Sequence, residues 1–170
     1  MTQATLYLFI GYPGAGKTTA ARVIHKATGA VHLWADHERL KLFERPTHSH
    51  EESLELYDQL NAAAEYMLKQ GKSVIFDTNF NFYADRQKLR KIATKYGAQT
   101  VVIWLTTPEA VAKKRAVHDQ NLRNGYQFAM SSEQFDAIAA KLEPPRKSEK
   151  IIKIDGAKLD ESELLRHLGR

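Results

Sequence analysis

One eight-residue segment constrains the fold of this chain more than any other. Residues 11–18 read GYPGAGKT and follow a short apolar run over residues 6–10. The segment fits the pattern G-x-x-x-x-G-K-[ST], in which glycines let the backbone turn so that its N–H groups converge on one point. A helix that starts there adds the positive end of its dipole. The segment therefore predicts a strand, an anion-binding loop and a helix.

The residue types in this loop indicate a nucleoside triphosphate as the anion. Lys17 would bridge the outer phosphates, and the Thr18 hydroxyl would ligate Mg²⁺. The predicted cofactors are therefore ATP and Mg²⁺. The plainer alternative is a tight turn in which a lysine happens to follow a glycine. The residues expected to contact the nucleotide are Gly11, Pro13, Gly14, Ala15, Gly16, Lys17, Thr18 and Thr19.

Short apolar runs alternate with longer amphipathic stretches along the whole chain. The apolar runs predict strands over residues 6–10, 31–35, 73–76, 100–105 and 151–154. The other stretches predict helices over residues 17–28, 36–43, 51–70, 83–96, 108–122, 131–142 and 161–168. Strands that alternate with helices favour a parallel sheet covered on both faces. Because no repeat or linker interrupts the pattern, we expect one three-layer α/β/α domain over residues 1–170.

Composition narrows the class of protein further. The chain has no cysteine, which excludes disulfides, thiolate zinc sites and cysteine nucleophiles. Its 25 Lys and Arg against 20 Asp and Glu give a net charge of +5, which suits an anionic partner. The first apolar run is too short for a signal-peptide core or a membrane span. These features predict a soluble, cytoplasmic protein.

A carboxylate follows the third predicted strand. Asp77 would lie at the carboxyl edge of the sheet, where ligands of open α/β sheets gather. Mg²⁺ bound to a phosphate chain usually has a carboxylate nearby, so we predict Thr18 and Asp77 as the metal site. The alternative is a turn or helix-capping aspartate.

A second acidic residue follows the second predicted strand. Asp36 would lie at the same sheet edge, with Arg39 on the same helical face. Asp36 would take the proton of an acceptor hydroxyl, and Arg39 would orient the acceptor or hold a neighbouring phosphate. A helix-capping aspartate with an ordinary ion pair is the alternative.

Basic residues gather near the end of the fifth predicted helix. Lys113, Lys114, Arg115 and Arg123 belong to a segment, about residues 113–131, that would close over the nucleotide as a lid. An arginine from it would neutralise charge on the transferred phosphoryl group. A solvated helix face would have the same composition.

Several segments together resemble the kinase domain of 5′-polynucleotide kinases. More broadly, they are similar to the P-loop kinase group that also holds zeta toxins and chloramphenicol phosphotransferase. The segments are residues 11–18, the pair Asp36-x-x-Arg39, residues 74–81 (VIFDTNFN), and residues 142–145 (LEPP) with Glu149. The resemblance covers nearly the whole chain.

The resemblance implies a P-loop NTPase fold with strand order 2-3-1-4-5 and a helical lid. It also implies Asp36 as general base, Arg39 as acceptor-site arginine and Asp77 at the Walker B position. Arg115 and Arg123 compete for the role of lid arginine.

The leading interpretation is an ATP-dependent kinase that phosphorylates a hydroxyl group. A nucleic-acid 5′-hydroxyl acceptor needs a basic groove built from residues such as Arg39, Lys41 and Arg45. A small metabolite or antibiotic needs an enclosed pocket, with residues such as Trp34, Phe43 and Tyr57. The alternative from another class is a nucleotide-dependent switch or ATPase module that acts on a partner protein and does not need Asp36.

Overall fold

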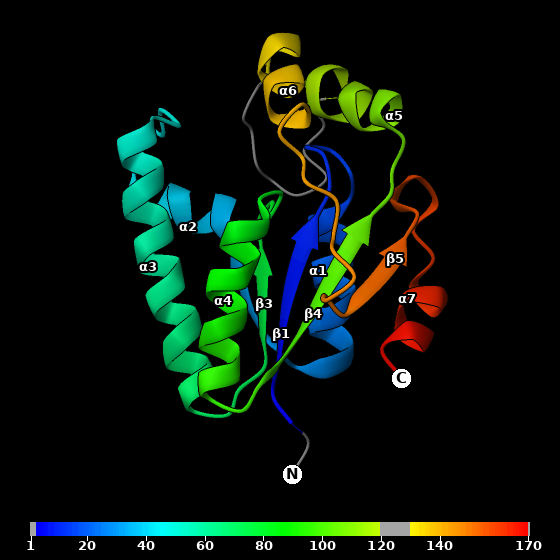
Figure 1. Cartoon of the computed structure of the whole chain (residues 1–170). Coiled ribbons are helices and arrows are strands. Elements are labelled where there is room, and N and C mark those ends of the chain that lie inside the picture. The colour runs from blue at the N-terminus through cyan, green and yellow to red at the C-terminus, as the bar shows by residue number, and fades with distance from the viewer. Residues whose placement is uncertain (1–2, 120–129, 170) are drawn as a thin grey trace.

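The computed structural model describes residues 3–119 and 130–169. At its centre is a parallel five-stranded sheet in the order β2-β3-β1-β4-β5 (Figure 1). The strands are β1 (Thr5–Ile10), β2 (Val31–Trp34), β3 (Val74–Asp77), β4 (Gln99–Leu105) and β5 (Ile151–Ile154). This is the predicted fold class and the strand order that the resemblance implied.

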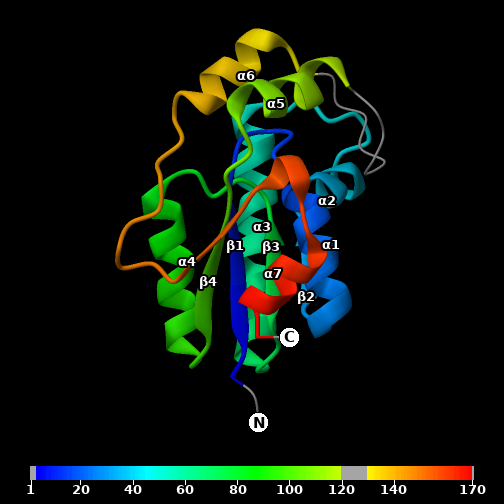
Figure 2. The ribbon, with the colours of Figure 1, turned by 90° about the vertical axis from the view of Figure 1, so that its right-hand side faces the viewer.

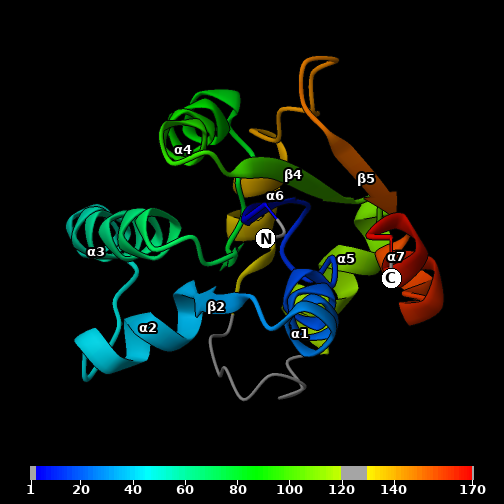
Figure 3. The same cartoon turned by 90° about the horizontal axis from the view of Figure 1, so that it is seen from below.

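Helices cover both faces of the sheet, which gives three layers (Figure 3). Helices α1 and α7 pack on one face, and α3 and α4 on the other. The α-helices are α1 (Lys17–Thr28), α2 (Ala35–Leu42), α3 (His50–Lys69), α4 (Tyr83–Lys95), α5 (Glu109–Lys113), α6 (Ser132–Ala139) and α7 (Glu161–His167). A π-helical turn, Lys114–His118, continues α5, and a 3₁₀ turn, Gly156–Lys158, follows β5.

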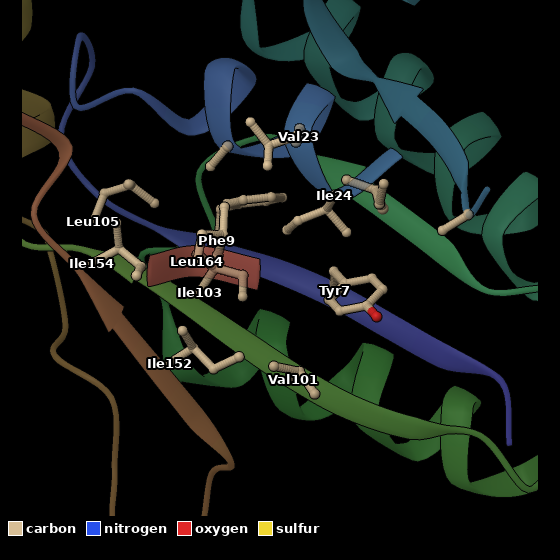
Figure 4. Packing of buried hydrophobic residues seen from close by; sticks show 14 of the residues in the cluster. Tyr7, Phe9, Val23, Ile24, Val101, Ile103, Leu105, Ile152, Ile154 and Leu164 are labelled. Atoms are coloured by element: carbon tan, nitrogen blue, oxygen red, sulfur yellow. The ribbon is translucent and has the colours of Figure 1, made fainter. Parts of the chain in front are cut away.

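The strict alternation of side chains along β1 divides the core in two. Tyr7 and Phe9 join the cluster under α1 and α7, which includes Leu164 (Figure 4). Leu6 and Leu8 belong to the cluster under α3 and α4. Because both faces are buried, the strand is apolar at nearly every position. Each fully buried Leu or Phe contributes about 1.5–3 kcal/mol.

Several element boundaries differ from the sequence prediction. Strand β2 ends at Trp34, so Asp36 lies in the first turn of α2 and Trp34 occupies the N-cap position. Pro108 also precedes its helix as the N-cap residue, with a ψ of 137° that is not helical. The helix predicted over residues 131–142 begins with the expected capping box at Ser131 but already ends at Ala139.

Helices α5 and α6 stand together beyond the edge at which β1 ends (Figure 2). They flank the segment predicted as a lid, whose residues 120–129, including Arg123, lie outside the described residues. A lid over about residues 113–131 therefore stays a prediction. Within the described parts of the chain, the search for a helix with the length and apolarity of a membrane span finds none.

Candidate active site

The loop over residues 11–18, here called the P-loop, joins β1 to α1 and depends on two left-handed glycines. Gly14 has φ +78° and Gly16 has φ +105°, values that other residues adopt at a cost. A Cβ on Gly14 would also lie 2.4 Å from the carbonyl oxygen of Ala112. Gly14 therefore meets two demands, because it permits the turn and lets the P-loop approach α5 closely.

Three residues from distant segments fix the P-loop backbone. The Gly11 N–H donates to Asn81 Oδ1 at 3.2 Å, and Asn81 Nδ2 donates to the Gly11 carbonyl at 3.3 Å. The Thr107 hydroxyl donates to the Ala15 carbonyl at 2.7 Å. Gly156 lies so close that an added Cβ would be 2.0 Å from the same carbonyl oxygen. The loop is therefore held in shape by the protein itself.

These anchoring residues were not among the predicted site residues. Asn81, Thr107 and Gly156 each lie in a segment just after the carboxyl end of a strand, as the predicted aspartates do. Their position after a strand could have marked them as candidates. The neighbouring sequence, however, does not show which residues in such positions reach the P-loop.

The Lys17 side chain folds back over the P-loop. Its Nζ donates to the carbonyl oxygens of Gly11 at 3.1 Å and Tyr12 at 2.7 Å. Burial lowers the pKa of Lys17 to about 8, although the carboxylates of Asp77 and Asp36 oppose that change. The ammonium therefore lies in the field of both predicted aspartates.

Asp77 ends β3 beside the start of α1, and its side chain is almost completely buried. The Thr18 hydroxyl donates to Oδ1 at 3.3 Å, and His32 Nε2 lies 2.9 Å from Oδ2. A hydroxyl beside a carboxylate oxygen is a hard donor set of the kind Mg²⁺ prefers, so these residues fit the predicted metal. His32, which orients the carboxylate from β2, was not predicted.

Asp36 approaches the same place from the first turn of α2. Burial, and after it the charge of Asp77, raise the pKa of its carboxyl group to about 6, while Lys17 and Arg39 act in the opposite direction. The two aspartates and Lys17 therefore interact electrostatically, as the shared sheet edge predicts.

Arg39 does not pair with Asp36. It is buried, and its Nη1 donates to the Glu52 carboxylate of α3, while Nη2 donates to the Ser53 hydroxyl at 3.3 Å. Its Nε has no hydrogen-bond partner among the described residues. The ion pair joins α2 to α3 and places the guanidinium between them.

Glu52 organises the loop before α3 as well. Its carboxylate accepts hydrogen bonds from the Thr47 N–H at 2.7 Å, the Thr47 hydroxyl at 2.9 Å and the His48 N–H at 3.2 Å. Burial would raise the pKa of this carboxyl group, but these bonds and Arg39 lower it to about 2. Nothing in the sequence singles out Glu52 except its position in an amphipathic helix.

Tyr57 of α3 contacts the segment that follows β3. Its hydroxyl lies 2.7 Å from that of Thr78, just after β3. Burial raises the pKa of Tyr57, the Thr78 hydrogen bond opposes this, and the charge of Asp36 adds to it. Tyr57 is therefore near enough to Asp36 to sense its charge.

Arg115 is the predicted lid arginine that the structure describes. From the π-helical turn it donates to the carbonyl oxygens of Gly156 at 2.9 Å and Ala157 at 3.2 Å. A third contact, 3.5 Å to the Gly14 carbonyl, reaches the P-loop. Arg115 thus lies beside the loop, whereas no position is assigned to Arg123.

Comparison with known proteins shows the family to which the chain belongs. A family model described as an AAA domain matches residues 6–145, which is most of the chain. The chain belongs to this AAA-domain family. A search of curated proteins gives no match.

Solved structures with the same fold as this AAA domain include several small kinases. A candidate kinase from Chloroflexus aurantiacus J-10-fl is 16% identical, with a TM-score of 0.78 over 99% of this chain and 98% of that chain. The APS kinase CysC of Mycobacterium tuberculosis, in complex with AMPPNP and APS, is 16% identical, with a TM-score of 0.68 over 100% of both chains. A gluconokinase from Sinorhizobium meliloti 1021 is 21% identical, with a TM-score of 0.63 over 97% of this chain and 88% of that chain.

A chain of the Pnkp1/Rnl/Hen1 RNA repair complex is also similar. It is 22% identical, with a TM-score of 0.69, and the match covers 84% of this chain and 45% of that chain. At these identities the AAA domain shares a fold with its neighbours, and the acceptor of a phosphoryl group does not follow from them.

Proposed function

We propose that the protein is a kinase that transfers the γ-phosphoryl group of ATP to a hydroxyl group of a small molecule. The observation that carries the proposal is the convergence of Lys17, Asp77 and Asp36 beside a preformed P-loop. A P-loop with one carboxylate would serve an ATPase. A second, half-buried carboxylate that is not engaged with Arg39 supplies a base for an acceptor hydroxyl.

Each site residue has a defined task in this reaction. Lys17 and the backbone N–H groups of the P-loop bind the phosphates and neutralise their charge. Thr18 and Asp77 would hold Mg²⁺, which supplies further charge neutralisation when bound. The acceptor oxygen forms a bond to the γ-phosphorus while the bond to the β–γ bridging oxygen breaks, which leaves ADP. The proton of the acceptor hydroxyl passes to Asp36.

The raised pKa of Asp36 suits it to this task. A carboxylate with a pKa near 6 is a stronger base than an ordinary aspartate, yet it is mostly ionised at pH 7 and above. Lys17 and Arg39 limit the shift and keep the base in its active form.

The charges near Asp36 favour a small acceptor over a nucleic acid. A nucleic-acid groove would need basic side chains free to meet phosphates. Arg39 is instead buried against Glu52, and Lys41 Nζ donates to Glu38 at 2.8 Å. Tyr57 and Thr78 add neutral hydroxyl groups on the acceptor side. A gluconokinase and an APS kinase among the structural neighbours agree with a kinase of small molecules.

Transfer of label from [γ-³²P]ATP tests the proposal. The purified protein is incubated with Mg²⁺ and either a metabolite extract or a 5′-hydroxyl oligonucleotide, and products are separated from ATP. We expect label in a small molecule, lost in Lys17→Ala and in Asp36→Asn. Glu38→Gln, on the exposed side of the same helix, is the matched control and should retain transfer.

The other outcomes decide between the alternatives. Label on the oligonucleotide would replace the small acceptor with a nucleic acid. Release of inorganic phosphate alone, at a rate unchanged in Asp36→Asn, would contradict the kinase and support the ATPase or switch.

A further inference from the structure

Away from the P-loop, a cavity lies between α4, the start of β4 and the chain that leads into β5. Figure 1 and Figure 2 both place that leading chain on the same face of the sheet as α4. The cavity has a volume of about 270 Å³, several times the roughly 30 Å³ that one water molecule occupies. Its floor is formed by Leu8, Thr100 and Val102. Because Thr100 is near the first residue of β4, the cavity lies toward the sheet edge opposite the P-loop.

The walls of this cavity carry more positive than negative charge. Arg86, Arg90 and Lys150 line it together with the carboxylate of Glu149. Arg86 and Glu149 neutralise each other through two hydrogen bonds, Nε to Oε1 at 2.7 Å and Nη2 to Oε2 at 3.1 Å. Arg90 and Lys150 take part in none of the ion pairs that the described residues form. Two cations therefore remain without a counter-charge.

An unsatisfied polar atom lies behind the floor of the cavity, closed off from solvent. Thr100 Oγ1 is buried and has no hydrogen-bond partner within the described residues. A hydroxyl can donate one hydrogen bond and accept two, and leaving it buried without any is unfavourable. Lys150 is held at the rim by a hydrogen bond to Gln99 Oε1 at 2.8 Å. The donors of Arg90 and Lys150 thus lie at the wall of the cavity, with the Thr100 hydroxyl behind its floor.

We propose that this cavity is a binding site for a small oxyanion, a ligand that carries a carboxylate or phosphate group. The oxyanion would accept hydrogen bonds from Arg90 and Lys150, and it would supply the missing negative charge. The apolar floor limits the ligand to one whose remaining atoms are few and uncharged. This site does not depend on the proposed kinase activity, since it shares no residue with the P-loop.

Amide chemical shifts can distinguish this site from the P-loop, which also binds phosphate. The ¹⁵N-labelled full chain is titrated at constant ionic strength with inorganic phosphate, with malonate and with uncharged glycerol. We expect saturable shifts at residues 98–100 and 148–150 with at least one anion and none with glycerol. The same shifts should persist in Lys17→Ala, whose P-loop no longer holds phosphate. The arm that saturates at lower concentration identifies the preferred oxyanion.

Two substitutions then test the named donors. Arg90→Gln and Lys150→Gln should each weaken binding at residues 98–100, the former by at least about tenfold, because it removes a charge-assisted hydrogen bond. Lys91→Gln, an exposed neighbour on α4 that does not line the cavity, is the matched control and should bind normally. Dispersed spectra establish that each variant is folded.

Three outcomes would overturn the proposal. These are saturable shifts only at the P-loop amides, equal shifts with glycerol, and unchanged affinity in both Arg90→Gln and Lys150→Gln. Each would mean that the cavity is not a site for an oxyanion.

Discussion

At the scale of single residues, Asp36 combines a chemical advantage with a cost to the fold. Its carboxyl group is close to the like charge of Asp77 and is partly removed from water, and both effects disfavour the ionised form. The protein tolerates this because Lys17 and Arg39 offset part of the penalty. Two measurements follow, one on rate and one on stability.

The pH dependence of kcat/KM should show the titration of Asp36. The base must be ionised to accept a proton, so the rate should rise tenfold per pH unit up to about pH 6, level off, and fall above about pH 8, where Lys17 loses its proton. Steady-state assays with the acceptor found by label transfer give this profile. A limb centred near pH 4 would mean that the active base is an ordinary, unshifted carboxylate.

Asp36→Asn should lose activity and gain stability. The folded-state pKa is raised from 3.8 to about 6, so folding is penalised while the group is ionised, and the penalty fades as the pH falls through 6. At pH 8 we expect a gain of about 1–3 kcal/mol in the free energy of unfolding. Urea denaturation at pH 8 and pH 4 measures the difference, which should nearly vanish at pH 4. A variant less stable than the parent at pH 8 would contradict this account.

At the scale of elements, the P-loop is shaped by its neighbours as much as by its own glycines. Asn81 after β3, Thr107 after β4 and Gly156 after β5 all contact its backbone. The segment that contains Asn81 is in turn tied down through Arg86, whose Nη1 donates to the Phe80 carbonyl at 2.7 Å. The segments that follow β3, β4 and β5 therefore all help to hold the P-loop in shape.

Asn81→Ala should weaken nucleotide binding and stability together. It leaves the buried N–H and carbonyl groups of Gly11 without their partners, which costs about 1–3 kcal/mol. Calorimetric titration with ATP and Mg²⁺, with thermal unfolding beside it, measures both effects. Asn61→Ala on α3 is the control substitution. Normal ATP affinity in Asn81→Ala would show that the loop keeps its shape without this anchor.

At the scale of the whole molecule, one sheet edge carries the proposed chemistry. Since all strands are parallel, their carboxyl ends meet there, and the loops that follow them supply the P-loop, Asp36, Asp77 and Arg115. The opposite half of the molecule contains the cavity beside α4. A ligand bound at the carboxyl edge of the sheet contacts several elements at once, so it should stabilise the whole fold.

ATP with Mg²⁺ should raise the melting temperature of the protein. At a nucleotide concentration about 100 times Kd, the gain is about 2.7 kcal/mol, or roughly 5–10 °C for a chain of this size. Differential scanning calorimetry with and without nucleotide measures the shift. Lys17→Ala should lose most of it, and an equal shift in that variant would place nucleotide binding elsewhere.

The sequence alone determined the local features. The glycine pattern of residues 11–18 fixes a strand, a turn and a helix within one short stretch, and the alternation of apolar and amphipathic runs fixes the α/β class. The helix over Lys17–Thr28 has the predicted bounds, with Gly29 in the left-handed C-cap conformation. These features depend on interactions between residues a few positions apart, so a short stretch of sequence is enough to predict them.

Only the tertiary structure decided which distant groups meet. Arg39 could pair with Asp36 by spacing, yet it pairs with Glu52, because α3 packs against α2 and offers a buried carboxylate. Asn81 and Thr107 reach the P-loop across 70 and 92 residues of chain. Such contacts follow from the order in which the strands pair. Long-range packing across the parallel crossovers sets that order, and no local sequence pattern encodes it.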